Sequence, residues 1–156
     1  MIGSKLVIYP LFERFYEPLN LHKVEYLTAA GYAMAYFGLP RYSDDLDLWV
    51  NPSQANMSRL SSALIGLGRN LIMDAILKHN PGDGSMKFGT NPMAVNVHLS
   101  LPELAFETAY ANQEVIQISD LIIPFISKHD YIVSKLSSDR IQDVTDGKII
   151  QSLKGR

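Results

Sequence analysis

Cysteine is absent from the 156 residues of the chain. A disulfide framework, a cysteine-based zinc site and a thiol nucleophile are therefore excluded. Charge is also scarce: 19% of the residues are charged while 47% are hydrophobic. This composition excludes a disordered chain, a coiled coil and a collagen. Lys and Arg number 14 against 16 Asp and Glu, so the chain lacks the positive excess of a protein that binds nucleic acid mainly through its charge.

Long apolar segments are missing as well. The two uncharged runs, residues 26–40 and 88–102, are too short to span a membrane and contain Gly, Pro or Asn. The apolar residues 6–12 are interrupted by Pro10 and lack the small-residue cleavage site of a signal peptide. No internal repeat or low-complexity linker divides the chain. We therefore expect a single cytoplasmic domain, residues 1–156, with no membrane contact.

Alternating apolar residues bounded by turn signals predict a set of short strands. The clearest is residues 44–50, which Asn51 and Pro52 close. The others are residues 25–28, a hairpin of residues 86–88 and 93–99, and residues 115–118 and 122–126.

Helical spacing and capping residues predict helices between these strands. They are residues 11–22 with an interruption at Pro18, residues 30–37, a helix from Ser53 to Gly66 or Gly68, residues 131–136 after a capping box of Ser127 and Asp130, and a helix from residue 139 that weakens at Gly147. Helices and strands alternate without a regular βαβ rhythm. We therefore expect an α/β or α+β domain built on a mixed sheet.

The strand at residues 44–50 carries an Asp-x-Asp motif. Side chains alternate along a strand, so Asp45 and Asp47 point to one side while Leu46 and Leu48 point to the other. Two carboxylates about 6–7 Å apart are natural ligands for a hard divalent cation. The alternative is an edge strand with a charged outer face, and a motif this short does not exclude it.

The residues upstream of this strand can bind phosphate. Ala30-Gly31 stands at the start of a predicted helix, where a glycine lets a phosphate approach the backbone N–H groups. Arg41 and Ser43 follow that helix and can add a charged fork and a hydroxyl. A glycine that serves only packing is the alternative, so the interpretation depends on the combination with Asp45 and Asp47.

This order of motifs resembles the nucleotidyltransferase superfamily, and within it the small bacterial transferases of the abortive-infection and toxin–antitoxin type. Their pattern is a hydrophobic strand, a Gly-Gly or Gly-Ser pair, a spacer, and Asp-hydrophobic-Asp-hydrophobic. In this chain Ala30-Gly31 stands for the pair, thirteen residues intervene, and Asp45-Leu46-Asp47-Leu48 completes the motif. Further similarity to this subgroup lies in residues 31–33, 40–43, 53–56, 125–135 and 140–144.

The resemblance implies a minimal nucleotidyltransferase fold and Mg²⁺-dependent (or Mn²⁺-dependent) transfer of a nucleotidyl group from an NTP such as ATP to an acceptor hydroxyl. It implies RNA, in particular tRNA, or a protein as the acceptor, and a role in phage defence or beside a cognate antitoxin. The residues that it assigns are Asp45 and Asp47 to the metal, Ala30, Gly31, Arg41 and Ser43 to the phosphates, and Lys135 to the nucleotide.

The chain departs from the family pattern at two positions. Ala30 replaces the first glycine, a mild change if its φ angle is negative. Asn96 stands where the family carries a third carboxylate, and an amide can coordinate a metal but cannot take a proton. His98, two residues further on the same strand face, is a candidate substitute base. The alternative is a catalytically inactive protein of this fold that binds a nucleotide or a protein partner.

Other catalytic and binding patterns are weak or missing. Neither Gly-x-Ser-x-Gly, Gly-x-Gly-x-x-Gly nor Gly-Lys-Ser/Thr occurs, which excludes the corresponding hydrolase, dinucleotide-binding and P-loop motifs. Trp49 lies on the same strand face as the two aspartates and can stack on a base, although core packing is its usual role. Asp143 and Asp146 share a helix face, and we interpret them as surface charges or partners of Arg140 rather than metal ligands.

Overall fold

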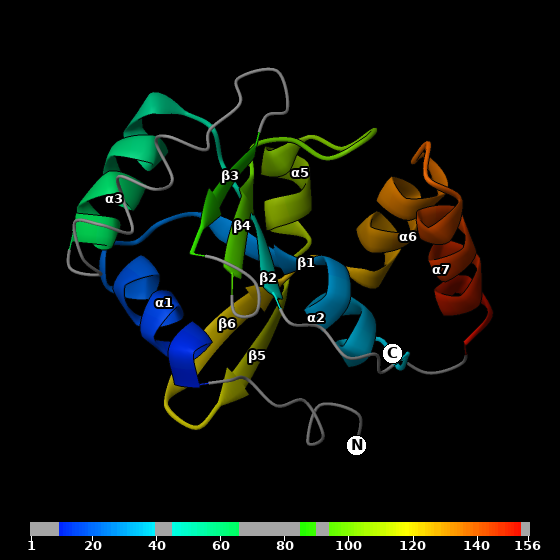
Figure 1. The fold of residues 1–156 in the computed structure, drawn as a ribbon, viewed down its shortest axis with the longest axis horizontal. Helices are drawn as coiled ribbons and strands as arrows, with labels where there is room; N and C mark the ends of the chain where they lie inside the picture. Colours follow the sequence, from blue (N-terminus) through cyan, green and yellow to red (C-terminus); the bar gives the residue numbers. More distant parts are fainter. Residues whose placement is uncertain (1–9, 40–44, 66–84, 90–93, 154–156) are drawn as a thin grey trace.

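A computed structural model describes residues 10–39, 45–65, 85–89 and 94–153. Its strands form a six-stranded sheet in the order β3-β4-β2-β1-β6-β5 (Figure 1). The strands are β1 Tyr26–Ala29, β2 Asp45–Val50, β3 Ser85–Phe88, β4 Ala94–His98, β5 Glu114–Ile118 and β6 Leu121–Phe125. β2 pairs with β4 in parallel and with β1 antiparallel, so the sheet is mixed.

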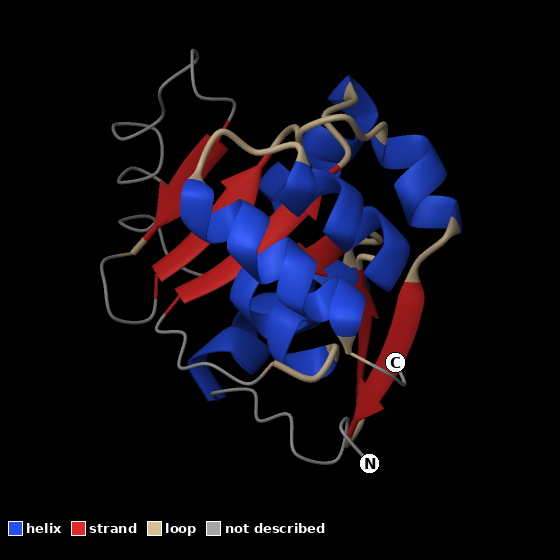
Figure 2. Cartoon of the chain, turned by 90° about the vertical axis from the view of Figure 1, so that its right-hand side faces the viewer, coloured by secondary structure: helices blue, strands red, loops and turns tan. Residues whose placement is uncertain are grey.

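Helices flank the sheet (Figure 2). They are α1 Pro10–Leu21, α2 Ala30–Tyr36, α3 Gln54–Ile65, α5 Phe106–Ala111, α6 Lys128–Leu136 and α7 Ile141–Ser152. α1 packs on β6 and α3, α2 packs on β1 and β2, and α6 pairs with α7. The expected α+β class with a mixed sheet flanked by helices is confirmed.

The two faces of the sheet differ in chemistry because side chains alternate along each strand. Leu46 and Leu48 of β2 lie opposite Val95 and Val97 of β4, and all four side chains are buried. α1 covers this apolar face, where its Phe15 ring lies 5.8 Å from that of Phe88. The opposite face of the same strands is left for polar side chains.

The Asp-x-Asp strand is central in the sheet. β2 lies between β4 and β1, so the alternative of an edge strand with a charged outer face is wrong. The hairpin predicted at residues 86–88 and 93–99 is also present, with β3 and β4 paired antiparallel from Ser85 opposite His98 to Phe88 opposite Val95. An acidic pair in a central strand therefore needs another explanation than protection of an edge.

The interruption predicted at Pro18 is wrong, since α1 continues from Pro10 to Leu21 with Pro18 inside it. The carbonyl oxygen of Pro18 still accepts a hydrogen bond from the His22 N–H at 3.0 Å. The helix presents an apolar face whose burial outweighs the proline penalty. The buried residues of that face are Phe12, Phe15, Tyr16 and Leu19.

Two predicted helix starts are confirmed by their hydrogen bonds. Ser53 Oγ accepts from the Asn56 N–H at 3.2 Å before α3, and Ser127 Oγ accepts from the Asp130 N–H at 3.1 Å before α6. These hydroxyls satisfy helix N–H groups that have no partner within the helix. Among the described helices, none combines the length and the apolar character that a bilayer crossing demands.

Candidate functional site

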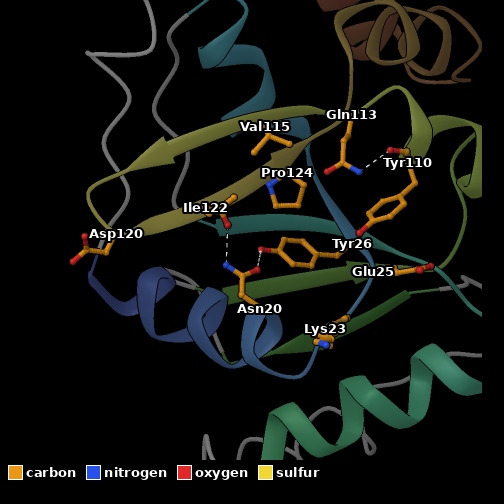
Figure 3. Close-up of a pocket in the computed structure, with 11 residues that line it drawn as sticks. Asn20, Lys23, Glu25, Tyr26, Tyr110, Gln113, Val115, Asp120, Ile122 and Pro124 are labelled. Atoms are coloured by element: carbon orange, nitrogen blue, oxygen red, sulfur yellow. Dashed lines mark hydrogen bonds between the residues drawn. The ribbon is translucent and has the colours of Figure 1, made fainter.

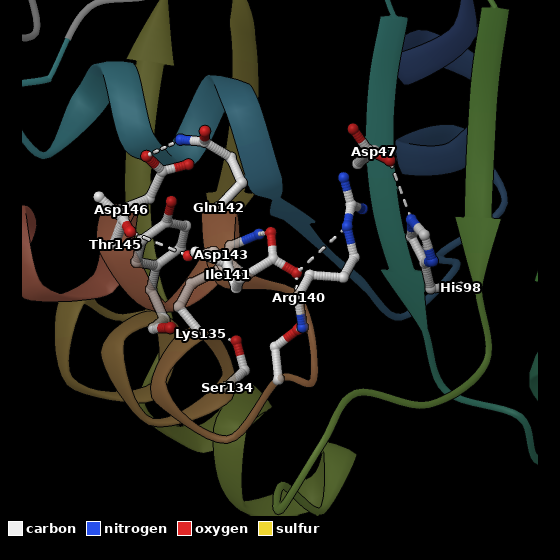
Figure 4. Close-up of polar contacts among 12 residues, drawn as sticks. Asp47, His98, Ser134, Lys135, Arg140, Ile141, Gln142, Asp143, Thr145 and Asp146 are labelled. Carbon is white, nitrogen blue, oxygen red and sulfur yellow. Dashed lines mark hydrogen bonds and ion pairs between the residues drawn. The ribbon is translucent and has the colours of Figure 1, made fainter.

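The strand register brings four polar side chains together on the face opposite α1. Asp47 of β2 lies directly opposite Asn96 of β4, and the next inward-facing pair is Trp49 and His98. Asp45 lies two residues before Asp47 and so shares its face. Figure 4 shows the resulting contact between Asp47 and His98.

Hydrogen bonds link these side chains into one cluster. Asn96 Nδ2 donates to Asp45 Oδ2 at 2.8 Å and to Asp47 Oδ1 at 3.3 Å. His98 Nε2 lies 2.9 Å from the same Asp47 oxygen. The amide thus places the positive end of its dipole between two carboxylates, and this arrangement offsets part of their mutual repulsion.

A cavity of about 410 Å³ opens over this cluster. The strand cluster forms one wall, and residues from α6, α7 and the turn between them form the other. The lining residues are Ala29, Ala30, Asp45, Asp47, Asn96, His98, Leu101, Pro102, Ile126, Tyr131, Ser134, Lys135, Ser138, Arg140 and Asp143. We call this space the carboxylate cavity.

The helical wall of the carboxylate cavity carries the opposite charge. Lys135 Nζ lies 3.3 Å from Asp143 Oδ1 and 5.6 Å from the centre of the Tyr131 ring. The second Asp143 oxygen accepts from Ser138 Oγ at 2.7 Å, and Arg140 Nε lies 4.0 Å from it (Figure 4). Burial alone would raise the pKa of Asp143, but the Ser138 hydroxyl and the Lys135 ammonium lower this pKa below its usual value.

The Ala30-Gly31 segment lies at the junction of β1 and α2, where Ala29 and Ala30 line the cavity. Ala30 has φ 50. This angle is positive, so the replacement of the first glycine by alanine is not the mild change that a negative angle would have made it. A non-glycine residue in the left-handed region is strained by about 1–2 kcal/mol. Gly31 follows as the second residue of α2. Arg41 and Ser43, expected to bind phosphate, lie outside the described residues.

The donor set of the cavity suits a hard divalent cation. Asp45 and Asp47 offer carboxylate oxygens, and Asn96 offers a carbonyl oxygen once its amide turns about its terminal bond. In the described part of the chain, no group of three or more His, Cys, Asp or Glu side chains is arranged to hold a metal. The pair fits Mg²⁺ only if water or substrate phosphates complete its shell, which is the usual way that proteins bind this ion.

Several residues of the helical wall escaped the sequence-based prediction. Asp143, interpreted as a surface charge or a partner of Arg140, also contacts Lys135 and Ser138. Asp146 is buried and accepts from Gln142 Nε2 at 2.8 Å, so its interpretation as a surface charge is wrong. The only signal was the short sequence distance between the two predicted helices, because a short turn between helices brings their facing residues together.

Trp49 does not offer a stacking surface in the cavity. Its side chain is 1% exposed, and its ring meets that of Phe106 edge to face at 5.2 Å and 83°. Core packing, the usual role of a tryptophan on a half-buried strand, therefore describes this residue.

A larger cavity of about 610 Å³ lies elsewhere, beside α1 and the β5–β6 hairpin (Figure 3). Tyr26 donates its hydroxyl to Asn20 Oδ1 at 2.7 Å, and Asn20 Nδ2 donates to the Ile122 carbonyl at 2.8 Å. Gln113 Nε2 donates to the Tyr110 carbonyl at 2.7 Å. These polar groups satisfy one another, so we place the chemistry in the smaller carboxylate cavity.

Comparisons with known proteins give a result at the level of fold. No family model and no curated protein matches the sequence. Among solved structures, the lincosamide antibiotic adenylyltransferase LnuA with lincomycin bound is 14% identical at a TM-score of 0.59, covering 95% of this chain and 99% of that one. TM1012 from Thermotoga maritima, a proposed nucleotidyltransferase, is 10% identical at a TM-score of 0.64, covering 95% of both chains.

A third structure agrees with these two. ANT(2″)-Ia in complex with adenylyl-2″-tobramycin is 14% identical at a TM-score of 0.56, covering 93% of this chain and 88% of that one. The alignments span nearly the whole chain, so the likeness is one of the whole fold rather than of the sheet alone. The chain has the fold of the nucleotidyltransferase superfamily, as its resemblance in sequence predicts.

Proposed function

We propose that the chain transfers a nucleotidyl group from an NTP to an acceptor hydroxyl in the carboxylate cavity. One observation carries the proposal: Asp45 and Asp47 face Lys135 across a single cavity of a nucleotidyltransferase fold. A carboxylate pair able to hold a divalent cation and an ammonium able to meet phosphate are the two charges that phosphoryl chemistry needs. Their sequence separation is large, so only the fold brings them together.

Each residue has a distinct role in this proposal. Asp45 and Asp47 would hold Mg²⁺ or Mn²⁺, and such an ion neutralises triphosphate charge when bound. The backbone at Ala30 and Gly31 would meet phosphate, with Arg41 and Ser43 as further donors and Lys135 as a fixed positive charge. These contacts would orient the NTP for in-line attack of the acceptor hydroxyl on the α-phosphorus, with pyrophosphate as the leaving group.

The proton of the acceptor hydroxyl needs a separate account. Asn96 cannot take a proton. His98 is the candidate substitute base, but its Nε2 lies 2.9 Å from Asp47 Oδ1. An acceptor hydroxyl would reach His98 through Nδ1, or through Nε2 after the contact with Asp47 opens.

The acceptor is the least constrained part of the proposal. The sequence resemblance favours tRNA or a protein, with a cognate antitoxin as a regulatory partner. LnuA has lincomycin bound and ANT(2″)-Ia carries adenylyl-2″-tobramycin, which adds a small hydroxylated molecule as a third class. A cavity of about 410 Å³ falls in the size range of small-ligand sites, and a polymer acceptor would insert only its end.

Label transfer tests the proposal directly. The protein is incubated with each α-labelled NTP and Mg²⁺ or Mn²⁺, together with total tRNA, a protein extract or a panel of aminoglycosides and lincosamides. Label should pass to one acceptor class, and Asp45→Asn and Asp47→Asn should abolish it. Unchanged transfer by both variants would overturn the assignment of Asp45 and Asp47 to the active site. If the folded protein binds NTP but transfers no label, the proposal that it is a transferase is overturned.

A second candidate is a catalytically inactive protein that binds a nucleotide or a protein partner. The contacts of Asn96 favour it, because its amide donates to both Asp45 and Asp47 and so links the two carboxylates without a cation. Calorimetry separates the two candidates. The catalytically inactive protein should bind NTP with the same affinity with and without Mg²⁺. The transferase should bind NTP more tightly when Mg²⁺ is present.

A further inference from the structure

Helix α7 contacts Lys135 of α6 at two separate points. Asp143 meets the end of the lysine side chain, and Gly147 lies against its base. Asp143 and Gly147 are four residues apart, so they lie one above the other on the same face of α7. One face of α7 therefore contacts Lys135 at both ends of its side chain.

The first contact is a held ion pair. Asp143 uses one oxygen for Lys135 at 3.3 Å and the other for the Ser138 hydroxyl at 2.7 Å. The Lys135 and Asp143 side chains are only 19% and 17% exposed. Ser138 therefore fixes the carboxylate, and the carboxylate in turn fixes the ammonium, with less screening than at an open surface.

The second contact is a close approach of the two helices. A Cβ atom added at Gly147 would lie 2.9 Å from Lys135 Cβ and 3.2 Å from Leu136 Cδ2. Separations below about 3.0 Å do not occur between real Cβ atoms, so any other residue would push α7 away from α6. Glycine weakens a helix interior, and this close approach gives the physical reason for its presence.

We infer that Asp143 and Gly147 are positioning residues that fix Lys135 in the wall of the carboxylate cavity facing Asp45 and Asp47. A free lysine has a flexible stem and loses much conformational freedom when its ammonium meets a ligand. Lys135 meets this cost in the folded protein, because the base of its side chain packs against Gly147 and its Nζ pairs with Asp143. Preorganisation of this kind strengthens binding without adding a contact.

The part of the inference that concerns nucleotide rests on the proposed function. The ion pair with Asp143 leaves Lys135 able to bind a ligand, since an ammonium has three donors and a carboxylate oxygen occupies one of them. The remaining donors can meet a phosphate while Asp143 stays bound. Asp143 therefore acts on the anion through Lys135.

A double-mutant cycle on nucleotide affinity tests the coupling. Asp143→Asn should weaken ATP binding about threefold to tenfold by calorimetry, and Lys135→Met should weaken it at least as much. In the Lys135→Met background, Asp143→Asn should have no further effect. The matched control is Asp139→Asn, which removes an equal charge from an exposed residue nearby and should leave affinity unchanged. Additive losses would overturn the positioning role.

A second measurement does not depend on nucleotide. Labelling of each lysine by an amine reagent is followed by mass spectrometry in wild type, Asp143→Asn and Gly147→Ala. Lys135 should react several-fold faster in both variants, because its ammonium is released from the wall. Lys23, an exposed lysine outside α6 and α7, is the internal control and should keep its rate.

The outcomes distinguish this inference from the proposed function. If Lys135 is labelled faster in both variants while the wild-type protein binds no NTP, the positioning is supported and the proposed function is overturned. Unchanged labelling of Lys135 with a lower melting temperature would mean that Asp143 and Gly147 serve only the packing of α6 on α7, and would overturn the inference. Asp143→Glu provides a rescue test, since it keeps the charge and should restore part of the slow labelling.

Discussion

Two asparagines of this chain, Asn56 and Asn96, share a side chain and differ in what surrounds it. Asn56 is fully buried, and its amide pairs with main-chain groups: Oδ1 accepts from the Glu25 N–H at 2.8 Å, and Nδ2 donates to the carbonyls of Glu25 at 3.0 Å and Asn51 at 2.8 Å. Asn96 donates to the carboxylates of Asp45 and Asp47 at the surface of a cavity.

The difference in partners separates a structural role from a functional one. Glu25 precedes β1 and Asn51 follows β2, so Asn56 of α3 closes the end of this strand pair. Main-chain groups that are shielded from water need a protein partner, and Asn56 supplies it for the Glu25 N–H and the Asn51 carbonyl, which makes the cluster a permanent part of the fold. Carboxylates at a cavity can exchange an amide for water, a cation or a ligand, so the cluster around Asn96 can change its partners.

The largest predicted effect breaks the Asn56 cluster. Asn56→Ala removes a fully buried amide and leaves the half-buried Glu25 N–H and Asn51 carbonyl without their side-chain partners. We expect the free energy of unfolding to fall by about 3 kcal/mol, measured by urea denaturation at neutral pH. Asn112→Ala, at an exposed asparagine, is the control and should change stability by less than about 0.5 kcal/mol. A loss below about 1 kcal/mol for Asn56→Ala would show that water replaces the amide.

The next largest effect is a loss of folding stability caused by Asn96→Asp, which Mg²⁺ should reverse. Asn96→Asp replaces the donor between Asp45 and Asp47 with a third carboxylate, so the folded protein should lose about 1–2 kcal/mol in a chelator. Millimolar Mg²⁺ should restore this loss, because a cation then binds three carboxylates.

Thermal unfolding with and without Mg²⁺ measures this reversal. The melting temperature of Asn96→Asp should rise with Mg²⁺ by more than that of wild type, whereas that of Asn56→Ala should respond as wild type does. If Mg²⁺ leaves the melting temperature of Asn96→Asp unchanged, the three carboxylates do not converge on one cation. The cluster around Asn96 would then not exchange its partners as the comparison with Asn56 predicts.

The contrast between the clusters also explains what the sequence could predict. Asp45, Asp47, Asn96 and His98 follow a period of two within single strands, and this local rule placed each pair on one face before any pairing was known. The position of Asn96 opposite Asp47 depends on the parallel register of β2 and β4. The alternation does not give this register, and the family resemblance only put Asn96 at the position of the third carboxylate.

Contacts between distant elements were out of reach of the sequence. Asn56 has helical neighbours on both sides, and nothing in its own segment indicates bonds to Glu25, 31 residues away. The role of Gly147 was likewise hidden, because a helix-weakening glycine and a glycine that lets two helices meet look the same until Lys135 Cβ lies beside it. Local rules describe faces and caps, whereas tertiary packing decides which faces meet.

A smaller effect belongs to the edge of the carboxylate cavity. Ala30 has φ 50, a conformation that glycine adopts freely. Ala30→Gly should relieve the strain of the left-handed region but lose entropy to a more flexible unfolded chain, for a net gain of about 0.5–1 kcal/mol. Urea denaturation measures it, with Ala111→Gly in α5 as the control. The control should lose about 0.5–1 kcal/mol, and a loss at both positions would mean that Ala30 is not strained.

The smallest effect is a difference in pH dependence between the two regions. The Ser138 hydroxyl and the Lys135 ammonium lower the pKa of Asp143 against the effect of burial. In the unfolded chain this carboxyl takes a proton near pH 3.9, before it does so in the folded protein. Its contribution to stability is therefore present above that pH and disappears as the pH falls through the lowered value.

The stability difference between wild type and Asp143→Asn should accordingly be constant from pH 7 to about pH 5 and shrink toward zero below about pH 4. The loss caused by Asn56→Ala should persist over the same range, because Glu25 and Asn51 contact Asn56 through main-chain groups that do not titrate. Denaturation series for both variants from pH 7 to pH 3 compare them directly. A pH-independent Asp143→Asn difference would mean that the carboxylate contributes through its shape and hydrogen bonds rather than its charge, and the cavity wall would then resemble the Asn56 cluster.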